Sequence, residues 1–368
     1  MPTITAPRRP RLPGRPLLDL LAWPHGIDRY LELLDPRWTS REVRARVTAV
    51  RSQTPDTVTV TLRPNDAWKG FEAGQFVRLT VEVDGVRRTR CYSPANSAAG
   101  RDGLIELTAK VHDHGMVSPR LRDLRPGTVV ALSPAEGAFT LPAERPAELV
   151  LVSGGSGITP LLSMLRTLAD EGHRGSVTLL HYSLDARHVL YRHELAALTR
   201  GLPGVRIVHA YTDQDHGADL HGCFEPDHLR AAAPRYAEAE IYVCGPNPLI
   251  DAVRDVLQAE GRSDHLHVEQ FAPPLPAPVL DPDAIDGDLV FVRSGSRAAN
   301  TGATLLDQAE AAGLTPDSGC RMGICHTCTT RKVSGATRDL RTGELHTAPD
   351  CDIQLCVNVP VGDVELLV

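Results

Sequence analysis

After an N-terminal arm, hydrophobic and polar residues alternate along the first third of the chain. From Glu42 to Leu141 the alternation has a period of two residues and is broken by turn dipeptides such as Asp84-Gly85. Because successive side chains of a strand point to opposite faces of a sheet, this pattern predicts an antiparallel barrel or sandwich over residues 42–142. The predicted strands read VRARVTAV, DTVTVTL, QFVRLTVEV, LIELTAKV and TVVALS.

From residue 143 to 272, apolar strands alternate with segments whose apolar residues recur at helical spacing. The first strand, Glu148–Val152, is followed by a glycine-rich turn and by a helix over Leu161–Asp170. We expect Thr159 to cap this helix, with Pro160 in its first turn, where proline loses no needed donor. Strands that alternate with helices predict a parallel sheet with right-handed crossovers. Further strands are expected at Val177–His181, Val205–Ala210 and Ile241–Cys244, with helices after Tyr191 and Pro248.

A proline-rich stretch, FAPPLPAPVLDP, separates this region from the last one. Its composition predicts a semi-rigid linker, which we place at residues 273–286. Beyond it, residues 287–368 read as a small α+β domain with a strand LVFVRS, a helix ATLLDQAEAAG and late strands ending in VELLV. At the other end of the chain, residues 1–41 are expected to form an arm, with two short amphipathic helices within Leu17–Leu34.

Composition and charge narrow the choice of partners and compartment. The chain has 368 residues, a net charge of −7 and a pI of about 6.1, so the phosphate backbone of a nucleic acid should repel it. The apolar run Leu17–Trp23 is short and interrupted, which argues against a signal peptide, and no stretch approaches the roughly 20 apolar residues needed to cross a bilayer. We therefore expect a cytoplasmic monomer. The basic, leucine-bearing arm could in addition touch an anionic membrane, although one short arm binds weakly.

Four of the eight cysteines have the spacing of metal ligands. Cys320, Cys325 and Cys328 are spaced C-x4-C-x2-C on one loop, and Cys356 follows at a distance. Three thiolates on a loop and a fourth from a distant segment are the ligand set of a plant-type 2Fe–2S cluster. A zinc site is the structural alternative, but zinc sites usually pair C-x2-C with a second close pair. Metal ligation instead of a disulfide framework agrees with a reducing compartment.

Two further motifs suit cofactors that contain phosphate. A glycine-rich turn between a strand and a helix lets backbone N–H groups approach a pyrophosphate, and the helix N-terminus adds positive potential. Its spacing is not G-x-G-x-x-G, so a simple tight turn is the alternative. Near a strand end, an arginine, a tyrosine and a serine offer a guanidinium, an aromatic face and a hydroxyl, although such residues are more often surface and edge packing. The two sets are Gly154, Gly155 and Gly157, and Arg90, Tyr92 and Ser93.

In this order the motifs resemble the ferredoxin–NADP reductase superfamily, in its three-part version with a C-terminal plant-type ferredoxin, over about residues 42–368. The resemblance implies an antiparallel β-barrel that binds FAD, an α/β domain with a parallel sheet that binds NAD(P), and a β-grasp 2Fe–2S ferredoxin domain. It implies that Arg90 holds the flavin pyrophosphate, that Tyr92 packs on the flavin, and that Ser93 hydrogen-bonds near flavin N5. A second flavin motif, matched by Gly115 and Ser118, would close on the pyrophosphate and favours FAD over FMN.

The same resemblance implies roles for residues of the second domain. Thr159 would lie near the nicotinamide. The family's Cys-Gly-Pro motif is matched by Cys244, Gly245 and Pro246, which would place Cys244 beside the point of hydride transfer, whereas by itself it reads as a buried thiol at a strand end. Phe271 sits where relatives place an aromatic residue that covers the flavin. Ser93, Cys244 and Thr159 are thus the candidate catalytic residues.

The choice between NADPH and NADH depends on the residues after the second strand of this domain. Relatives selective for NADPH carry a hydroxyl and an arginine here, because a 2′-phosphate requires charged donors. Ser183 and Arg187 match that pattern and favour NADPH. Asp185 lies between them and could instead bind a ribose diol, as in enzymes that use NADH.

Together these features predict a reductase that carries electrons from NAD(P)H through FAD and a 2Fe–2S cluster to an acceptor protein. The N-terminal LELLDPRW and the loop SGCRMGICHTC resemble actinobacterial reductases that serve membrane-bound di-iron fatty acyl desaturases or hydroxylases. A reductase for a soluble oxygenase, of the Rieske, cytochrome P450 or di-iron type, is the alternative within this class. A non-catalytic flavin and iron–sulfur redox sensor is the alternative outside it.

Overall fold

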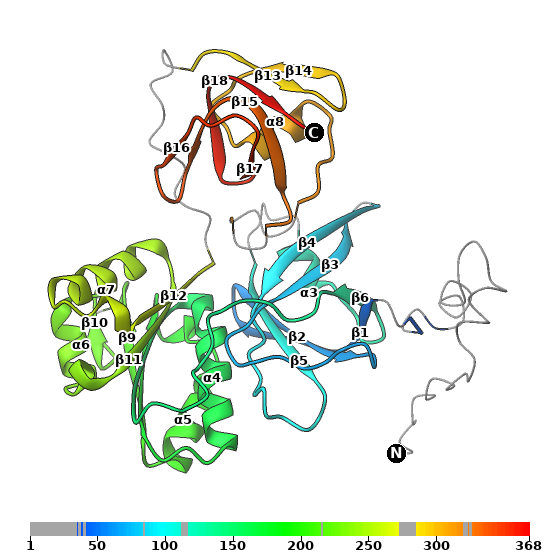
Figure 1. Cartoon of the computed structure of the whole chain (residues 1–368). Helices are drawn as coiled ribbons and strands as arrows, with labels where there is room; N and C mark the ends of the chain where they lie inside the picture. Colours follow the sequence, from blue (N-terminus) through cyan, green and yellow to red (C-terminus); the bar gives the residue numbers. More distant parts are fainter. Residues whose placement is uncertain are drawn as a thin grey trace.

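The computed structural model describes residues 35, 38–39, 42–83, 85–111, 117–214, 216–271, 285–318, 323 and 326–368. Three sheets follow one another along the chain, each in its own domain (Figure 1). The two predicted helices of the arm, nearly all of the proline-rich linker, Gly115, Cys320 and Cys325 lie outside the described residues. Within the described ranges, no helix is both long enough and apolar enough to span a membrane.

The first domain is an antiparallel sheet of six strands in the order β4-β3-β6-β1-β2-β5. Exposed and buried residues alternate along β1 and β3, so that their apolar side chains fill the interior. A bridge between Pro94 and Leu107 joins the segment after β4 to β5, which closes the sheet into the predicted barrel. The elements are β1 (Val43–Thr54), β2 (Thr57–Pro64), β3 (Val77–Val83), β4 (Val86–Tyr92), β5 (Ile105–Lys110), α3 (Ser118–Arg122) and β6 (Val129–Leu132).

The second domain is the predicted parallel sheet, in the order β10-β9-β8-β7-β11-β12. The strand order reverses between β7 and β11, and the carboxyl ends of these two strands therefore flank the crevice in which such sheets bind ligands. The strands are β7 (Glu148–Gly154), β8 (Ser176–Ser183), β9 (Val205–Tyr211), β10 (Leu220–His221), β11 (Glu240–Gly245) and β12 (Leu266–Gln270). The helices are α4 (Ile158–Asp170), α5 (Arg192–Gly201), α6 (Pro226–Ala232) and α7 (Asn247–Ala259).

The start of α4 differs from the prediction. A 3-10 turn over Gly155–Gly157 leads directly into the helix, so that its N-cap is Gly157. Thr159 is already inside the first turn and donates its hydroxyl to the carbonyl of Ser156, with an Oγ1–O distance of 3.2 Å. The predicted N-cap role of Thr159 is therefore wrong, because the glycines allow the chain to become helical before it.

The third domain is a mixed sheet packed against a short helix. Its strands run β14-β13-β18-β15-β16, with β17 beside β15, and β13 and β18 are parallel. Apolar side chains of the sheet and of α8 form a separate core that includes Phe291, Leu306 and Cys356. The elements are β13 (Asp288–Phe291), β14 (Ser296–Ala299), α8 (Leu305–Ala311), β15 (Thr329–Asp339), β16 (Leu345–His346), β17 (Cys351–Gln354) and β18 (Asn358–Leu366).

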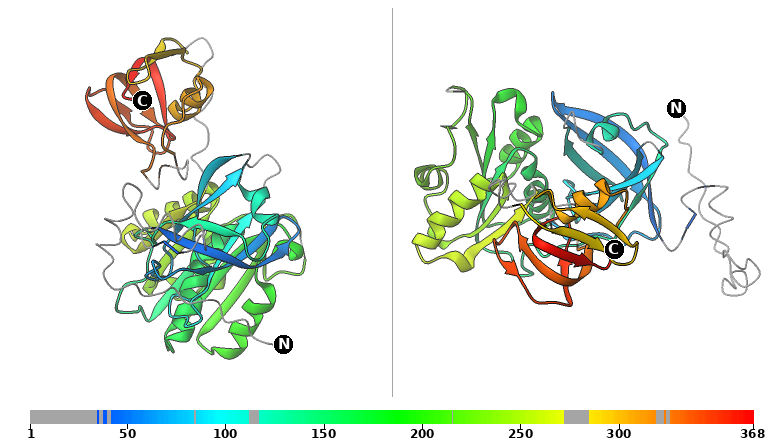
Figure 2. Two further views of the ribbon diagram at one scale, coloured as in Figure 1. Left: turned by 90° about the vertical axis from the view of Figure 1, so that its right-hand side faces the viewer. Right: turned by 90° about the horizontal axis from the view of Figure 1, so that it is seen from above.

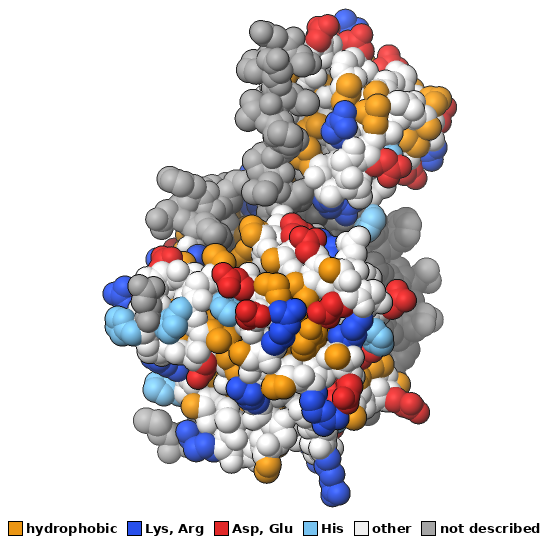
Figure 3. All heavy atoms as spheres, turned by 90° about the vertical axis from the view of Figure 1, so that its left-hand side faces the viewer, with side chains coloured by type: hydrophobic (Ala, Val, Ile, Leu, Met, Phe, Trp, Pro, Cys, Tyr) orange, Lys and Arg blue, Asp and Glu red, His pale blue; other side chains and the backbone are white. Residues whose placement is uncertain are grey.

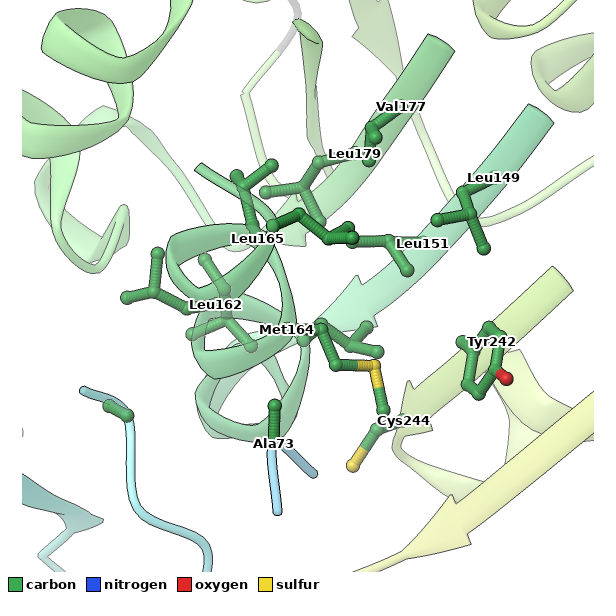
Figure 4. Close-up of a cluster of buried hydrophobic side chains, with 14 of the residues drawn as sticks. Ala73, Leu149, Leu151, Leu162, Met164, Leu165, Val177, Leu179, Tyr242 and Cys244 are labelled. Carbon is green, nitrogen blue, oxygen red and sulfur yellow. The ribbon is translucent and has the colours of Figure 1, made fainter. Parts of the chain in front are cut away.

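The barrel and the parallel sheet share one apolar cluster. Ala73 and Phe139 from the barrel side pack with Met164 of α4 and Tyr242 of β11 in a single buried set. Figure 4 shows Met164 next to Cys244, on the side of the cluster that faces Ala73. Because both domains contribute to this cluster, they pack directly against each other.

Arg166 reinforces this junction with polar contacts. Its Nη1 donates to the carbonyl of Ala95, at 2.6 Å, and to Glu106 Oε2, at 2.8 Å, both in the barrel. Its Nε and Nη2 pair with Glu194 of α5. The guanidinium also lies over the ring of Tyr191, 5.2 Å from the ring centroid. One side chain therefore links the barrel, α4 and α5.

The charges on the described surface are mixed. On the face shown in Figure 3, Lys and Arg side chains are interspersed with Asp and Glu, so the potential across this face has no single sign. The third domain lies over the β3–β4 hairpin of the barrel, as the two orientations of Figure 2 also show.

Candidate functional site

The carboxyl ends of β7 and β11 touch through their glycines. A Cβ on Gly157 would lie 2.2 Å from the carbonyl oxygen of Cys244, and a Cβ on Gly245 would lie 2.9 Å from the amide nitrogen of Gly154. Any side chain at these positions would push the two strand ends apart. Glycine is therefore required here by the contact between the two predicted motifs, a reason that the sequence pattern did not reveal.

The remaining glycine of the turn faces open space. Gly155 has φ +53, a left-handed conformation that suits glycine, and a Cβ there would meet nothing within 4 Å. The turn leads into α4, a helix of 13 residues whose first N–H groups have no partner within the helix. Free space beside N–H donors and the positive end of a helix fits the pyrophosphate of a dinucleotide.

Three polar side chains converge where the barrel meets this edge of the sheet. Ser93 follows β4, and its Oγ donates to Oε2 of Glu269 at 3.3 Å. Glu269 lies on β12 directly opposite Cys244 of β11. Their exposed fractions are 1% for Ser93, 8% for Glu269 and 0% for Cys244, so water is largely excluded from this group. The structure thus brings two of the three predicted catalytic residues together and adds a carboxyl group.

Burial changes the protonation of this group. Desolvation raises the pKa of Glu269 to about 8, although the hydrogen bond from Ser93 acts in the opposite direction. Desolvation, assisted by the nearby carboxyl of Glu269, raises the pKa of the Cys244 thiol well above its usual value. At neutral pH Glu269 is therefore an uncharged carboxylic acid and Cys244 an uncharged thiol.

Sequence reasoning did not select Glu269 as a functional residue. It precedes Gln270 and Phe271 at the end of a strand, and a glutamate there is usually exposed. The strand pairing with Cys244 shows why it is buried, and that pairing is a long-range property of the sheet. Phe271 is half-buried and packs against the shared apolar cluster.

The predicted flavin residues of the barrel lie at the end of β4. Tyr92 packs against the barrel core, and burial raises the pKa of its hydroxyl. Arg90 is half-buried, and its Nη1 donates to the carbonyl of Thr89 at 2.8 Å. Ser118 is the first residue of α3 and is buried, whereas its predicted partner Gly115 lies outside the described residues. An aromatic side chain and a guanidinium at one strand end fit a flavin and its phosphates.

The segment that should select the nicotinamide cofactor folds around Asp185. The Asp185 carboxylate accepts hydrogen bonds from the backbone N–H groups of Arg187 and His188, at 2.7 and 3.2 Å. It also pairs with the Arg187 guanidinium, at 3.1 Å, and with His188 Nδ1, at 2.8 Å. The bond to His188, followed by those to Arg187, keeps the pKa of this carboxyl below its usual value. Ser183 Oγ donates to the backbone carbonyl of Asp185 at 3.3 Å.

The structure places two of the four predicted cluster ligands side by side. The Sγ atoms of Cys328 and Cys356 are 3.2 Å apart, and both residues are buried. This separation is longer than a disulfide bond of about 2.05 Å, so no disulfide joins the two residues and both sulfurs are placed to ligate one metal centre. Cys320 and Cys325 lie outside the described residues.

Within the cysteine loop, the backbone carbonyl of Gly323 is bound by two side chains. Its carbonyl accepts hydrogen bonds from Arg341 Nη1, at 2.7 Å, and from Gln354 Nε2, at 3.0 Å. Arg341 also donates to Asp339 and Gln354. These contacts connect Gly323 of the loop to Asp339 of β15 and Gln354 of β17.

Comparison with known proteins finds a family model for each of the three domains. Family models match in order: an oxidoreductase FAD-binding domain at residues 44–141, an oxidoreductase NAD-binding domain at 151–255 and a 2Fe-2S iron-sulfur cluster binding domain at 292–357. An NADPH oxidoreductase of Mycobacterium tuberculosis is 36% identical over 344 residues, which cover 92% of this chain and 88% of the relative. A glycine betaine monooxygenase reductase subunit of Pseudomonas aeruginosa is 30% identical, covering 80% of this chain and 87% of the relative.

A solved structure extends the likeness to three dimensions. Phthalate dioxygenase reductase, described as a modular structure for electron transfer from pyridine nucleotides to 2Fe-2S, superimposes with a TM-score of 0.61 and 26% identity. The match covers 88% of this chain and 97% of that protein. The sequence matches and the structural match therefore agree on the three domains, on their order along the chain and on their fold. The chain belongs to the ferredoxin–NADP reductase superfamily, as an NAD(P)H-dependent oxidoreductase with an FAD-binding barrel, an NAD(P)-binding domain and a C-terminal 2Fe–2S ferredoxin domain.

Proposed function

We propose that this chain is the reductase component of an oxygenase, which takes electrons from NADPH and delivers them singly to the oxygenase. The observation that carries the proposal is the meeting of Ser93, Cys244 and Glu269 in the crevice between the first two domains. When bound, FAD accepts a hydride, which carries two electrons, and a 2Fe–2S cluster takes electrons one at a time. The protein positions the two cofactors, excludes water from the crevice and sets the protonation states of the residues that line it.

The residues of the crevice have distinct tasks in this proposal. The glycine turn and the N-terminus of α4 bind the pyrophosphate of the dinucleotide, and Cys244 and Thr159 line the place of the nicotinamide. Because its pKa is raised, Cys244 acts as an uncharged packing group and not as a thiolate nucleophile. Glu269 holds a proton beside Ser93, so that no uncompensated negative charge faces the reacting rings at neutral pH.

The cofactor choice is proposed to be NADPH. Oδ1 of Asp185 already accepts the Arg187 and His188 amides and pairs with His188 Nδ1, so only Oδ2 remains to meet a ribose diol. The Arg187 side chain is 79% exposed and can turn toward a 2′-phosphate, for which a guanidinium is well suited. The name of the Mycobacterium tuberculosis relative, NADPH oxidoreductase, supports the same choice.

Turnover of the purified holoprotein with each nicotinamide tests both parts of the proposal. We expect flavin and iron–sulfur absorbance, reduction of cytochrome c, and a higher kcat/KM with NADPH than with NADH. A colourless protein that binds zinc would contradict the proposal, and a coloured protein without steady turnover would favour a redox sensor. Equal kcat/KM values for NADPH and NADH would contradict the choice of NADPH but not the reductase function.

An oxygenase as the acceptor is supported by the names of two relatives, which serve glycine betaine monooxygenase and phthalate dioxygenase. A membrane-bound di-iron acyl desaturase is a second candidate, favoured by the likeness of the N-terminal LELLDPRW and of the cysteine loop to reductases of such enzymes. Reconstitution with both kinds of oxygenase separates the candidates. Deletion of residues 1–34 keeps Asp35, which pairs with Arg46 at 3.5 Å. If this deletion leaves co-sedimentation with membranes and desaturase turnover unchanged, the arm has no membrane role.

A further inference from the structure

Arg78, on strand β3 of the barrel, contacts the loop that carries the cluster ligands. Its Nη1 donates to Oγ1 of Thr327 at 2.9 Å, and its Nη2 donates to Oε1 of Glu136 at 2.7 Å. Glu136 is itself fixed beside β3, because its backbone pairs with Phe76. The guanidinium is therefore oriented by the barrel before it reaches across to the ferredoxin domain.

One end of this contact adjoins a predicted cluster ligand in sequence, and the other end lies across the β3–β4 strand pair from the flavin motif. Thr327 directly precedes Cys328, whose sulfur is 3.2 Å from that of Cys356. In the β3–β4 pairing, Arg78 lies opposite Cys91, the residue between Arg90 and Tyr92 of the flavin motif. One side chain thus connects the strand pair that presents the flavin residues to the loop that presents the cluster ligands.

The surroundings of Arg78 are open and mix polar with apolar side chains. A cavity of about 630 Å³ between the two domains is lined by Arg78, Arg87 and Lys69 from the barrel and by Ser318 and Thr327 from the ferredoxin domain. A second contact, between Arg88 of β4 and Glu310 of α8, spans 4.0 Å and is partly exposed. Exposed ion pairs of this kind contribute little to stability. The hydrogen bond from Arg78 therefore fixes the orientation of two groups across an interface that is otherwise open to solvent.

We propose that Arg78 is a positioning residue that holds the cluster loop, through Thr327, at the distance from the flavin strands that electron transfer between the two cofactors requires. Electron tunnelling slows steeply as two redox centres move apart, so loss of one fixed contact should slow this step more than hydride transfer. The side chains that make the contacts across the interface are partly exposed, which lets the ferredoxin domain leave after reduction and meet its acceptor. The proposal rests on the path from FAD to the cluster, and it is independent of which oxygenase receives the electrons.

Two substitutions remove the contact from opposite sides. Arg78→Met keeps the length of the side chain without the donor fork, and Thr327→Val keeps the shape of threonine without the acceptor oxygen. Arg87→Met is the matched control, because Arg87 lines the same cavity and its loss changes the charge equally. Arg78→Lys tests the fork itself, since lysine keeps the charge but not the two-pronged geometry.

Rapid mixing of each holoprotein with NADPH under anaerobic conditions follows the flavin and the cluster by their separate absorbance. We expect flavin reduction, and turnover with ferricyanide, to stay within about twofold of wild type in all variants. Cluster reduction and cytochrome c turnover should fall by about tenfold or more in Arg78→Met and Thr327→Val, since small misplacements carry costs of this size. The double variant should be no slower than either single one, because both remove the same bond.

Amide hydrogen exchange provides a readout that does not depend on activity. In Arg78→Met and Thr327→Val, exchange should quicken in residues 326–332 and in the β3–β4 hairpin, whereas Arg87→Met should match wild type. Unchanged cluster reduction, unchanged exchange, or an equal loss in Arg87→Met would overturn the proposal. A wild-type protein that reduces neither ferricyanide nor cytochrome c would instead overturn the reductase function, which keeps the two failures distinct.

Discussion

Ser93 and Glu269 meet across the boundary between the barrel and the parallel sheet, with Ser93 Oγ 3.3 Å from Glu269 Oε2. The first is 1% exposed and the second 8% exposed, and they belong to domains that different stretches of sequence build. A carboxyl group in this position has to fold without its charge, because desolvation penalises the ionised form. The stability of the protein is thereby linked to pH.

The pH dependence of that stability has a defined sign. Burial raises the pKa of Glu269 from 4.5 to about 8, so between these values the folded state keeps a proton that the unfolded state releases. The free energy of unfolding should therefore decrease as pH rises from about 4.5 to about 8, and this contribution should level off above that range. Glu269→Gln removes the titration. Calorimetry across pH 5–9 should show Tm of the wild type falling relative to Glu269→Gln, and parallel curves would contradict the buried, protonated state.

Arg187 should affect the choice of nicotinamide cofactor. Replacing it with alanine removes a charged donor for the 2′-phosphate, and such a bond contributes enough to raise KM for NADPH by about tenfold. KM for NADH, which lacks that phosphate, should change little. The exposed Arg200 of α5 supplies a control, Arg200→Ala, that should alter neither value. Steady-state kinetics with both cofactors measures the effect, and equal changes for NADPH and NADH would exclude a specific role.

Loss of Arg166 should destabilise the junction of the first two domains. Arg166→Met leaves Glu194 and Glu106 without a partner in a region where the arginine side chain is only 14% exposed. Because Glu106 and Glu194 are 25% and 37% exposed, the cost should lie below the roughly 3–5 kcal/mol of breaking a fully buried ion pair and above that of a surface pair. Arg145→Met removes a more exposed pair with Glu171 and should cost about 1 kcal/mol or less. Chemical denaturation measures the free energy of unfolding of both variants. Similar decreases in the two would contradict the role of Arg166 in linking the barrel, α4 and α5.

Cys356 should be necessary for the cluster, whereas Cys351 should not. Cys356→Ser removes one of the two sulfurs that face each other, so iron content and cluster absorbance should be lost, together with cytochrome c reduction. Ferricyanide reduction should persist, since it needs only the flavin. In Cys351→Ser the iron content should match wild type, because the Cys351 thiol donates to the carbonyl of Ala348, 3.2 Å away. Loss of iron in both variants would indicate a general folding defect.

The fold could be predicted from local patterns because hydrophobic residues recur with a different spacing in each domain. Alternation of hydrophobic and polar residues from Glu42 to Leu141 predicted the barrel, and alternating strands and helices predicted the parallel sheet. The cap of α4 was not predicted correctly, since the 3-10 turn at Gly155–Gly157 starts the helix before Thr159. Local propensity does not show how tightly a turn winds when a neighbouring strand end, here Cys244, packs against it.

The candidate site was less accessible to sequence reasoning than the fold. Ser93 and Cys244 stand in recognisable motifs, but Glu269 becomes part of their group only through the pairing of β11 with β12. Arg78 carries no signal at all, because an arginine on the outer face of a strand usually points to solvent. Its importance follows from the placement of the ferredoxin domain, which depends on contacts that are distant in sequence.

The apolar cluster shared by the barrel and the parallel sheet has a consequence for how the chain unfolds. Because Ala73, Phe139, Met164 and Tyr242 belong to one buried set, neither of the first two domains can melt without exposing the other. The ferredoxin domain has a core of its own, built from residues between Leu289 and Leu366. We therefore expect the three domains to unfold as two cooperative units, and a fragment that ends before the linker to fold and bind its flavin as a single body.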